Sequence, residues 1–564
     1  MKQIKKTMVT LMALVMCCGG VACGETGTGN GAADKTQVYI RYSDYGYGSA
    51  WITPLKQRFE TFYQDYSFEE GKKGVEVIPD PTGNDIGDDM LRSRSWVYFI
   101  EYDFTNTKYY SRSQDLTNAL TTSLGDAYGT DINGNPLPGL PNETKSVYDK
   151  MSTDEKSFYW LDEDKMIAAP YLDAYNGTLT YDVDLFEKYG LYYDATNELG
   201  AKKATGNLGL GPDGIQNTAD DGLPRTYYEF FELCDKMVST YGIVPFTWAG
   251  NFTNYISALA QSLILQNMGS EQYKTILKGE GVLYDYIDGE VGANGSYTTK
   301  QETITADKFD KMMSTASIYE AVDFIKQIIK GNGSDLYYKG ADNFSSSYTE
   351  ESAQADLFWG KKRDKDIGFL VDGNWWYNEA EKYIAAYENK YQTSRNNRNL
   401  AYMALPKANE ATWNRLKGEN LVASSYSSAI VVKKGLNPTQ QMLAELFVRF
   451  ACSNESLVEF HKIVSAPRGL SYTMTDIEYN ALSPYAKVMY DVHTGNADRG
   501  YNTYKICNLR SATGIGKTNP EKLTVTYWFA NTISNSNIAT TFYEHPEISS
   551  IEYYNAILKN YKLN

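Results

Sequence analysis

Short apolar runs of strand length alternate with capped helical segments along most of this chain, an order that few architectures accommodate. Residues 38–42 form the first such run, and Thr53-Pro54 then starts a predicted helix with an apolar face. Further predicted strands span residues 96–102, 166–171, 243–248 and 367–371, and further predicted helices start at Asp182, Thr226 and Asn437. Strands that alternate with helices predict α/β layers built on mainly parallel sheets.

The length of the chain predicts more than one lobe. Its 564 residues exceed what one hydrophobic core supports. Segments 194–222, 269–310 and 330–365 are rich in Gly, Asn, Ser and Asp. Because helical or strand patterns resume on both sides of each segment, we expect surface insertions there rather than linkers.

The N-terminus has the regions of a bacterial lipoprotein signal in order. Lys2, Lys5 and Lys6 give a cationic start, residues 9–16 are apolar, and small residues precede Cys23. An apolar run this short marks export and does not span a bilayer. The sequence therefore predicts a signal peptide over residues 1–22, lipidation of Cys23 with palmitate, and a flexible lipid-anchored tether over residues 23–36. The protein would lie on the outer face of the bacterial cell membrane.

Charge and cysteine content exclude several classes of protein. Removing residues 1–22 takes away three lysines and no acidic residue, so the net charge of −16 becomes −19. That balance repels nucleic acid. Beyond Cys23 the cysteines are Cys234, Cys452 and Cys507, too widely spaced for a disulfide framework or a metal site. We expect them to be small buried residues.

The aromatic content favours a carbohydrate ligand. The chain has 48 Tyr, 9 Trp and 21 Phe, or 14% of its residues. Tyrosine combines a flat apolar face with a hydroxyl. A pyranose offers the complementary pair, an apolar C–H face and a rim of hydroxyls.

Several passages carry short motifs in a fixed order. Residues 165–171 end in Pro-Tyr, residues 180–191 include Leu-Phe-Glu-Lys-Tyr-Gly-Leu, and residues 226–237 begin a capped helix. Residues 369–376 end in Asp-Gly-Asn-Trp-Trp, and residues 403–406, 429–433, 444–450 and 466–469 follow. In order and spacing these passages resemble the extracellular solute-binding lipoproteins of carbohydrate ABC transporters, the maltose-binding-protein-like family. The resemblance covers most of residues 38–475.

The resemblance implies a two-lobe α/β fold of the periplasmic-binding-protein-like (Venus flytrap) type, with hinge crossovers and surface insertions. The N-terminal lobe would comprise residues 37–170 and 405–468, and the C-terminal lobe residues 171–404 and 469–564. Crossings would lie near residues 170–178, 405–407 and 467–471. The implied partners are an oligosaccharide and the permease subunits of an ABC transporter, and we expect a monomer. Closure of two lobes around a ligand is a hinge motion.

Candidate ligand-binding residues follow the predicted strands, because ligands of open α/β sheets bind beyond the carboxyl ends of the strands. Trp375 and Trp376 are adjacent and cannot both face a cleft, and Trp375 is favoured by its match to the family position. Trp248 and Asn251 follow another strand. The remaining candidates are Asp44, Tyr45, Asp103, Asp173, Tyr175 and Asp372. A carboxylate can accept two sugar hydroxyls, although each acid could equally cap a loop.

An acidic loop is a candidate calcium site. Asp213, Asn217, Asp220 and Asp221 lie within a Gly-containing stretch. Hard oxygen ligands and a tight turn suit Ca²⁺, although the twelfth-position Glu of an EF-hand is missing. A plain acidic turn is the alternative. No cofactor is required, and any Ca²⁺ would be structural.

Little in the sequence indicates an enzyme. The histidines are His461, His493 and His545, and none lies in a metalloprotease or nucleophile-elbow motif. The function favoured is therefore capture of an oligosaccharide for an ABC transporter. A lipid-anchored glycoside hydrolase, which needs only two carboxylates and an aromatic cleft, stays an alternative. A binding protein for another solute, such as a peptide, is a further one.

Overall fold

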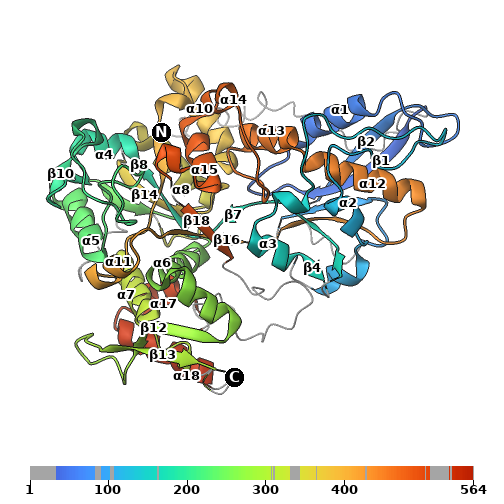
Figure 1. Cartoon of the computed structure of the whole chain (residues 1–564). Coiled ribbons are helices and arrows are strands. Elements are labelled where there is room, and N and C mark those ends of the chain that lie inside the picture. Colours follow the sequence, from blue (N-terminus) through green and yellow to red (C-terminus); the bar gives the residue numbers. More distant parts are fainter. Residues whose placement is uncertain are drawn as a thin grey trace, which may run out of the picture.

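The computed structural model describes residues 34–562 apart from 83–89, 102–103, 105–106, 162–163, 306–307, 309–310, 331–342, 364, 426–427, 502, 508–531 and 534–535. Figure 1 shows the elements gathered in two bodies, with strands β7, β16 and β18 between them. We call the body that contains β1 and α1 the first lobe, and the body that contains β8 and β14 the second lobe. Among the described residues, no helix has the length and apolar character needed to cross a membrane.

The first lobe is built on a mixed five-stranded sheet. Its strands are β2 (Val75–Thr82), β1 (Thr36–Ser43), β3 (Val97–Ile100), β17 (Ala429–Val432) and β6 (Ala169–Pro170), in that order. Strand β1 runs parallel to β2 and β3, whereas β17 runs antiparallel to β3 and β6. The strand predicted over 166–171 is thus divided between β5 (Lys165–Met166) and β6.

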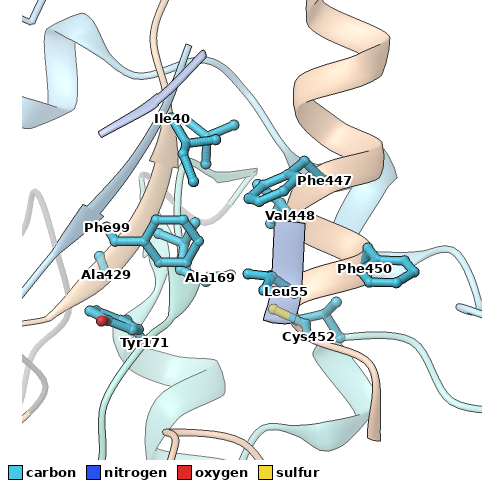
Figure 2. Packing of buried hydrophobic residues seen from close by; sticks show 14 of the residues in the cluster. Ile40, Leu55, Phe99, Ala169, Tyr171, Ala429, Phe447, Val448, Phe450 and Cys452 are labelled. Atoms are coloured by element: carbon cyan, nitrogen blue, oxygen red, sulfur yellow. The ribbon is translucent and has the colours of Figure 1, made fainter. Parts of the chain in front are cut away.

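Helices α1 (Ile52–Phe62) and α12 (Pro438–Ala451) pack together against this sheet. The rings of Phe59 and Phe447 lie 4.9 Å apart, edge to face. Figure 2 shows Leu55, Phe447 and Val448 on one side of this core and residues of the sheet, including Phe99, on the other. Segments about 400 residues apart in the sequence therefore share one hydrophobic core.

The start of α1 differs from the prediction. The helix begins at Ile52, and Trp51 occupies the N-cap position without a side-chain cap. The indole N–H of Trp51 instead donates to the carbonyl of Gly48 at 2.9 Å. Helix α12 begins as predicted, because Asn437 and Gln440 form a reciprocal capping box around Pro438.

The second lobe is built on a four-stranded mixed sheet. Its strands are β11 (Val244–Thr247), β14 (Ile367–Asp372), β8 (Thr178–Asp182) and β15 (Leu400–Met403), in that order. Strand β14 is parallel to β11, but β8 is antiparallel to both of its neighbours. The prediction of mainly parallel sheets was therefore wrong. Strands β8 and β17 each follow a crossing of the chain from one lobe to the other. Each runs antiparallel to both of its neighbours in the sheet.

Buried residues cover both faces of the second sheet. Phe369 and Val371 of β14 belong to one core with helices α5 (Tyr227–Lys236), α6 (Asn254–Lys278) and α7 (Ala316–Lys330). Ile367 and Leu370 belong to another core with α8 (Glu350–Trp359) and α10 (Glu381–Tyr391). Helix α8 lies inside the segment 330–365 that was predicted to be a surface insertion, so that prediction fails for this helix.

Local sequence explains the helix ends of the second lobe. Asp182 caps α4 (Val183–Tyr189) by accepting from the backbone of Leu185, and Gly190 ends it in a left-handed conformation. Thr226 likewise caps α5. A reciprocal capping box does not form there, because the carboxylate of Glu229 binds Arg225 instead.

The chain passes between the lobes through the three-stranded sheet β18-β16-β7 and its neighbours. Strand β7 (Ala174–Tyr175) follows β6, β16 (Asn420–Ser425) precedes β17, and β18 is Thr503–Cys507. Leu405, Leu421 and Ala423 pack with the second lobe, so the chain joins the first core at Ala429. That return is later than residue 405, where the resemblance places it, because β16 intervenes. Helix α15 (Pro484–Thr494) contributes residues to cores of both lobes.

Candidate functional site

Trp375 lies where the two lobes meet. It follows β14 and is only partly buried, whereas the residues around it are buried. Its ring contacts Tyr47 of the first lobe, with centroids 5.9 Å apart, and Tyr255 of the second lobe, with centroids 6.1 Å apart. This is the position beyond the carboxyl end of a strand at which α/β proteins bind ligands.

Glycines on both sides let the indole fit. A Cβ on Gly373 would lie 2.2 Å from the Trp375 ring, and a Cβ on Gly46 would lie 2.6 Å from its Cδ1 atom. Both separations are shorter than any real contact, so each backbone can approach the ring only because it lacks a side chain. The loop after β1 and the loop after β14 therefore hold Trp375 between them.

Side-chain hydrogen bonds connect the lobes beside this ring. The hydroxyl of Tyr47 donates to Oδ1 of Asn374 at 2.8 Å, and Nδ2 of Asn378 donates to the carbonyl of Gly46 at 2.9 Å. Asn374 also donates to the carbonyl of Asp173 and accepts from the backbone of Tyr175, which anchors it to the crossover. Sequence reasoning missed Tyr47, Asn374 and Asn378. The Gly-rich loop directly after the first strand was the only available signal for Tyr47.

Acidic side chains from both lobes lie at the ends of strands β3 and β14. Burial raises the pKa of Glu101 to about 8, and the carboxylates of Asp44 and Glu379 act in the same direction. Burial, followed by Glu379, raises the pKa of Asp372 well above its ordinary value. The amide of Gln354 donates to both Asp372 and Glu379, at 3.0 and 2.6 Å.

Glu101 was not among the predicted residues, although a neighbour was. The sequence placed the end of this strand at residue 102 and selected Asp103, which lies outside the described residues. Strand β3 ends at Ile100, so Glu101 is the first residue beyond it. Asp44 and Tyr45, which follow β1, are exposed. Asn251 is exposed as well, and its amide donates to Glu350 at 3.1 Å.

The other two predicted tryptophans lie in hydrophobic cores. Trp376 is fully buried, and its ring packs edge to face against Tyr485 at 5.1 Å. Trp248 is also fully buried, beside Phe246 and Phe344. Neither side chain has surface available for a ligand in this structure. Of the predicted tryptophans, the structure therefore brings only Trp375 to the junction of the lobes.

Asp173 and Tyr175 belong to a buried polar cluster at the crossover. Asp173 accepts from the hydroxyls of Tyr175 and Ser424 and from Nζ of Lys505, at 2.6, 2.5 and 2.7 Å, and lies 2.6 Å from Nδ1 of His493. Burial alone would raise the pKa of Asp173, but Lys505 and His493 outweigh it and lower the pKa well below the ordinary value. These contacts join β7, β16, β18 and α15.

The candidate calcium loop contains two adjacent buried carboxylates. Asp213 and Asp220 are buried, and the backbone N–H of Asp213 donates to Asp220 at 3.0 Å. Burial and the neighbouring Asp213 raise the pKa of Asp220 to about 7. Oδ2 of Asp213 has no hydrogen-bond partner. Asn217 has an exposed side chain, and its backbone N–H donates to Asp221.

Metal ligands of the usual kind are sparse. In the part of the chain that the structure describes, no group of three or more His, Cys, Asp or Glu is placed to hold a metal ion. A cation at the acidic loop would therefore need backbone or amide oxygens beside Asp213 and Asp220. The unpartnered Oδ2 of Asp213 is the observation that fits a hard cation.

Comparisons with known proteins identify the fold. No family model matches the sequence, and no curated protein matches it either. Solved structures do match. A chitin oligosaccharide binding protein is 13% identical with a TM-score of 0.51, and the match covers 94% of this chain and 99% of that one. A Streptococcus pneumoniae solute-binding protein in complex with the blood group A-trisaccharide has the same identity and TM-score, with coverage of 94% and 100%.

A third similar structure is a probable secreted solute-binding lipoprotein from Streptomyces coelicolor. It is 12% identical with a TM-score of 0.51, and the match covers 94% of this chain and 100% of that one. At these identities the likeness concerns the fold. The chain has the two-lobe α/β fold of solute-binding proteins, which confirms the fold class predicted from the sequence.

Proposed function

We propose that this chain, built on the two-lobe solute-binding fold, captures an oligosaccharide between its lobes and delivers it to the permease subunits of an ABC transporter. The observation that carries the proposal is Trp375, a partly exposed indole beyond the end of β14 that both lobes contact. A flat aromatic face suits the C–H face of a pyranose, and the flanking amide and carboxylate groups suit its hydroxyls.

The similar structures support this ligand class. Two of them are described with a chitin oligosaccharide and a blood group trisaccharide, and all three are described as binding proteins. We therefore propose a binding role for this chain rather than catalysis. A glycoside hydrolase would use an aromatic cleft and two carboxylates as well, so the test must examine the sugar after binding.

The test is calorimetric titration of the mature chain with a panel of neutral oligosaccharides, followed by analysis of the recovered sugar. We expect saturable binding of intact sugar. Trp375→Ala should weaken it at least tenfold, or about 1.4 kcal/mol. Tyr228→Ala serves as the matched control, because Tyr228 is the most exposed large aromatic side chain described outside this site. Cleaved products would contradict the proposal, as would unchanged binding by Trp375→Ala.

We also propose that the protein is held at the outer face of the cell membrane by a lipid on Cys23 and acts as a monomer. The order of cationic, apolar and small residues before Cys23 supports the anchor. Mass spectrometry of protein extracted from membranes should find the N-terminus at Cys23 carrying acyl chains such as palmitate. Cys23→Ala should release the protein from the membrane fraction, and retention there would count against the anchor.

Ca²⁺ is proposed as a structural ion of the acidic loop, held by Asp213 and Asp220. A divalent cation would relieve the repulsion between these adjacent buried carboxylates. Ca²⁺ should then raise the melting temperature, and a chelator should reverse the effect. Asp220→Asn should remove most of the response, whereas Asp65→Asn, at an exposed site in the first lobe, should keep it. A melting temperature that does not change when Ca²⁺ is added would contradict the proposal of a bound calcium ion.

A further inference from the structure

We infer that the ligand held between the lobes carries a positively charged amine, and that an oligosaccharide of amino sugars is the class that fits. This inference rests on the proposed function and specifies its ligand.

The carboxylates come from both sides of the junction. Glu101 and Asp44 follow strands β3 and β1 of the first lobe. Asp372 ends β14, and Glu379 ends the short helix α9 (Trp376–Glu379) of the second lobe. Glu101 is 9% exposed and Asp372 is 2% exposed, so both carboxylates are largely removed from water. Glu379 acts on the pKa of both, which places the three groups within electrostatic reach of one another.

Two buried oxygen atoms in this cluster lack a hydrogen-bond donor. Oε1 of Glu101 has no partner, although a backbone N–H from Tyr45 supports the carboxylate. Oε1 of Gln354 has none either, although Nε2 of this fully buried residue donates to Asp372 and Glu379. Buried acceptors are nearly always paired in native proteins. These two atoms therefore indicate that a bound ligand supplies hydrogen-bond donors.

The charges around the cluster are of one sign. Burial raises the pKa of Glu101, Asp372 and Glu379. Other carboxylates, such as Asp44 and Glu350, raise these pKa values further, and the groups that lower them are neutral hydrogen-bond donors. Among the described residues, the leading influences on these three pKa values include no lysine, arginine or histidine. The buried carboxylates at the crossover differ, since Asp173 is paired with Lys505. Buried carboxylates without a cation are costly, so a cation supplied by the ligand would be strongly favoured.

A protonated amine matches what this site lacks. An ammonium group offers three donors and no acceptor, so it suits acidic side chains and acceptor atoms that lack a donor. It also interacts favourably with the face of an indole, which Trp375 provides. The net charge, which is −16 for the whole sequence and −19 without residues 1–22, adds a long-range field that draws cations toward the protein. A neutral sugar would satisfy the stacking surface but would leave the carboxylates unpaired.

The test compares two trisaccharides that differ only in their amines. The mature chain is titrated with the trimer of glucosamine and with the trimer of N-acetylglucosamine, at a pH where the free amine is protonated. We expect at least tenfold tighter binding of the glucosamine trimer, or about 1.4 kcal/mol. The preference should weaken with added salt, because part of it is long-range attraction.

Variants identify the groups responsible. Glu101→Gln should remove most of the preference, measured as the ratio of the affinities for the two trimers, and Glu379→Gln should act in the same way if the first variant fails to fold. Glu455→Gln, at an exposed glutamate of the first lobe, is the matched control and should keep the preference. Circular dichroism establishes that each variant is folded before it is titrated.

The outcomes separate the two proposals. Equal or tighter binding of the N-acetylated trimer would overturn the cationic ligand and leave the carbohydrate receptor standing. An undiminished preference in folded Glu101→Gln and Glu379→Gln would also overturn it. A chain that binds neither trimer, and none of the neutral oligosaccharides, would overturn the proposed function itself.

Discussion

At the scale of single residues, two adjacent tryptophans have opposite environments. Trp375 contacts both lobes and is partly exposed, whereas Trp376 is enclosed in the core beneath β14. Trp376→Ala should therefore lower the free energy of unfolding by about 3–5 kcal/mol, the usual cost of emptying a core site of this size. Trp375→Ala should cost clearly less stability while it weakens binding. Urea unfolding of both variants checks this, and equal losses would contradict it.

The Asp173 cluster predicts a second effect at this scale. Asp173→Ala leaves the buried His493 and the partly buried Lys505 without their carboxylate, so it should cost about 3–5 kcal/mol. Because the pKa of Asp173 is lowered in the folded state, its contribution is present above the ordinary aspartate pKa. It should be lost as the pH falls through the lower, folded value. Urea midpoints at a series of pH values measure this, and Asp65→Ala at an exposed site is the control.

At the scale of secondary-structure elements, two glycines offer a matched comparison. Gly190 ends α4 and Gly242 ends the π-helical turn Met237–Tyr241, and both have a φ of 64°. A Cβ on Gly190 would lie 2.6 Å from the carbonyl oxygen of Gly200, whereas a Cβ on Gly242 would meet nothing within 4 Å. Gly242→Ala should thus cost only the left-handed backbone penalty of about 1–2 kcal/mol.

Gly190→Ala should cost more, because the clash with Gly200 adds to the same backbone penalty. The comparison is made by the shift in urea midpoint for the two variants. Equal shifts would show that the strand β10 (Leu199–Ala201), which contains Gly200, moves aside without cost.

Elements were the most predictable level of this protein. The strands near Val38 and Ile367 and the helices capped by Asp182, Thr226 and Asn437 occur where local patterns place them, because caps and periodicity act over a few residues. The direction of β8 and β17 was not predictable in this way. The direction of each strand depends on the order in which the chain crosses between the lobes, and local sequence does not reveal that order.

At the scale of the whole molecule, binding of protons should favour the closed arrangement, by which we mean the one described here, with the two lobes in contact at Trp375. Part of the raised pKa of Glu101 comes from Glu379 in the other lobe, so opening the lobes should lower this pKa from about 8. A group whose pKa is higher in the closed state binds protons on closing. Without ligand, closure should therefore be promoted as the pH falls from about 9 to about 6. Small-angle scattering should show a decreasing radius of gyration.

The groups that face Glu101 make this prediction specific. They include Asp44 and the Tyr45 backbone from the first lobe and Glu379 from the second, and the charge of Glu101 in turn adds to the effect of burial in raising the pKa of Tyr47 and Tyr171. Glu101→Gln should remove most of the change in radius, whereas Glu455→Gln should preserve it. A radius that is constant over this range in the unmodified protein would show that the cluster is equally buried in both arrangements.

The sequence was enough to predict the order of strands and capped helices, because these depend on local periodicity and composition, whereas the two-lobe class was predicted from the chain length and from the resemblance to solute-binding lipoproteins. Which side chains meet at the junction depends on how the two lobes pack. Strand β3 ends a little earlier than the pattern indicates, which puts Glu101 rather than Asp103 directly beyond it, and neighbouring side chains along a strand point to opposite faces. Tyr47 and Asn374 are 327 residues apart in sequence, and no local signal pairs them. Their contact follows from the packing of the two lobes, as does the exposure of Trp375 rather than Trp376.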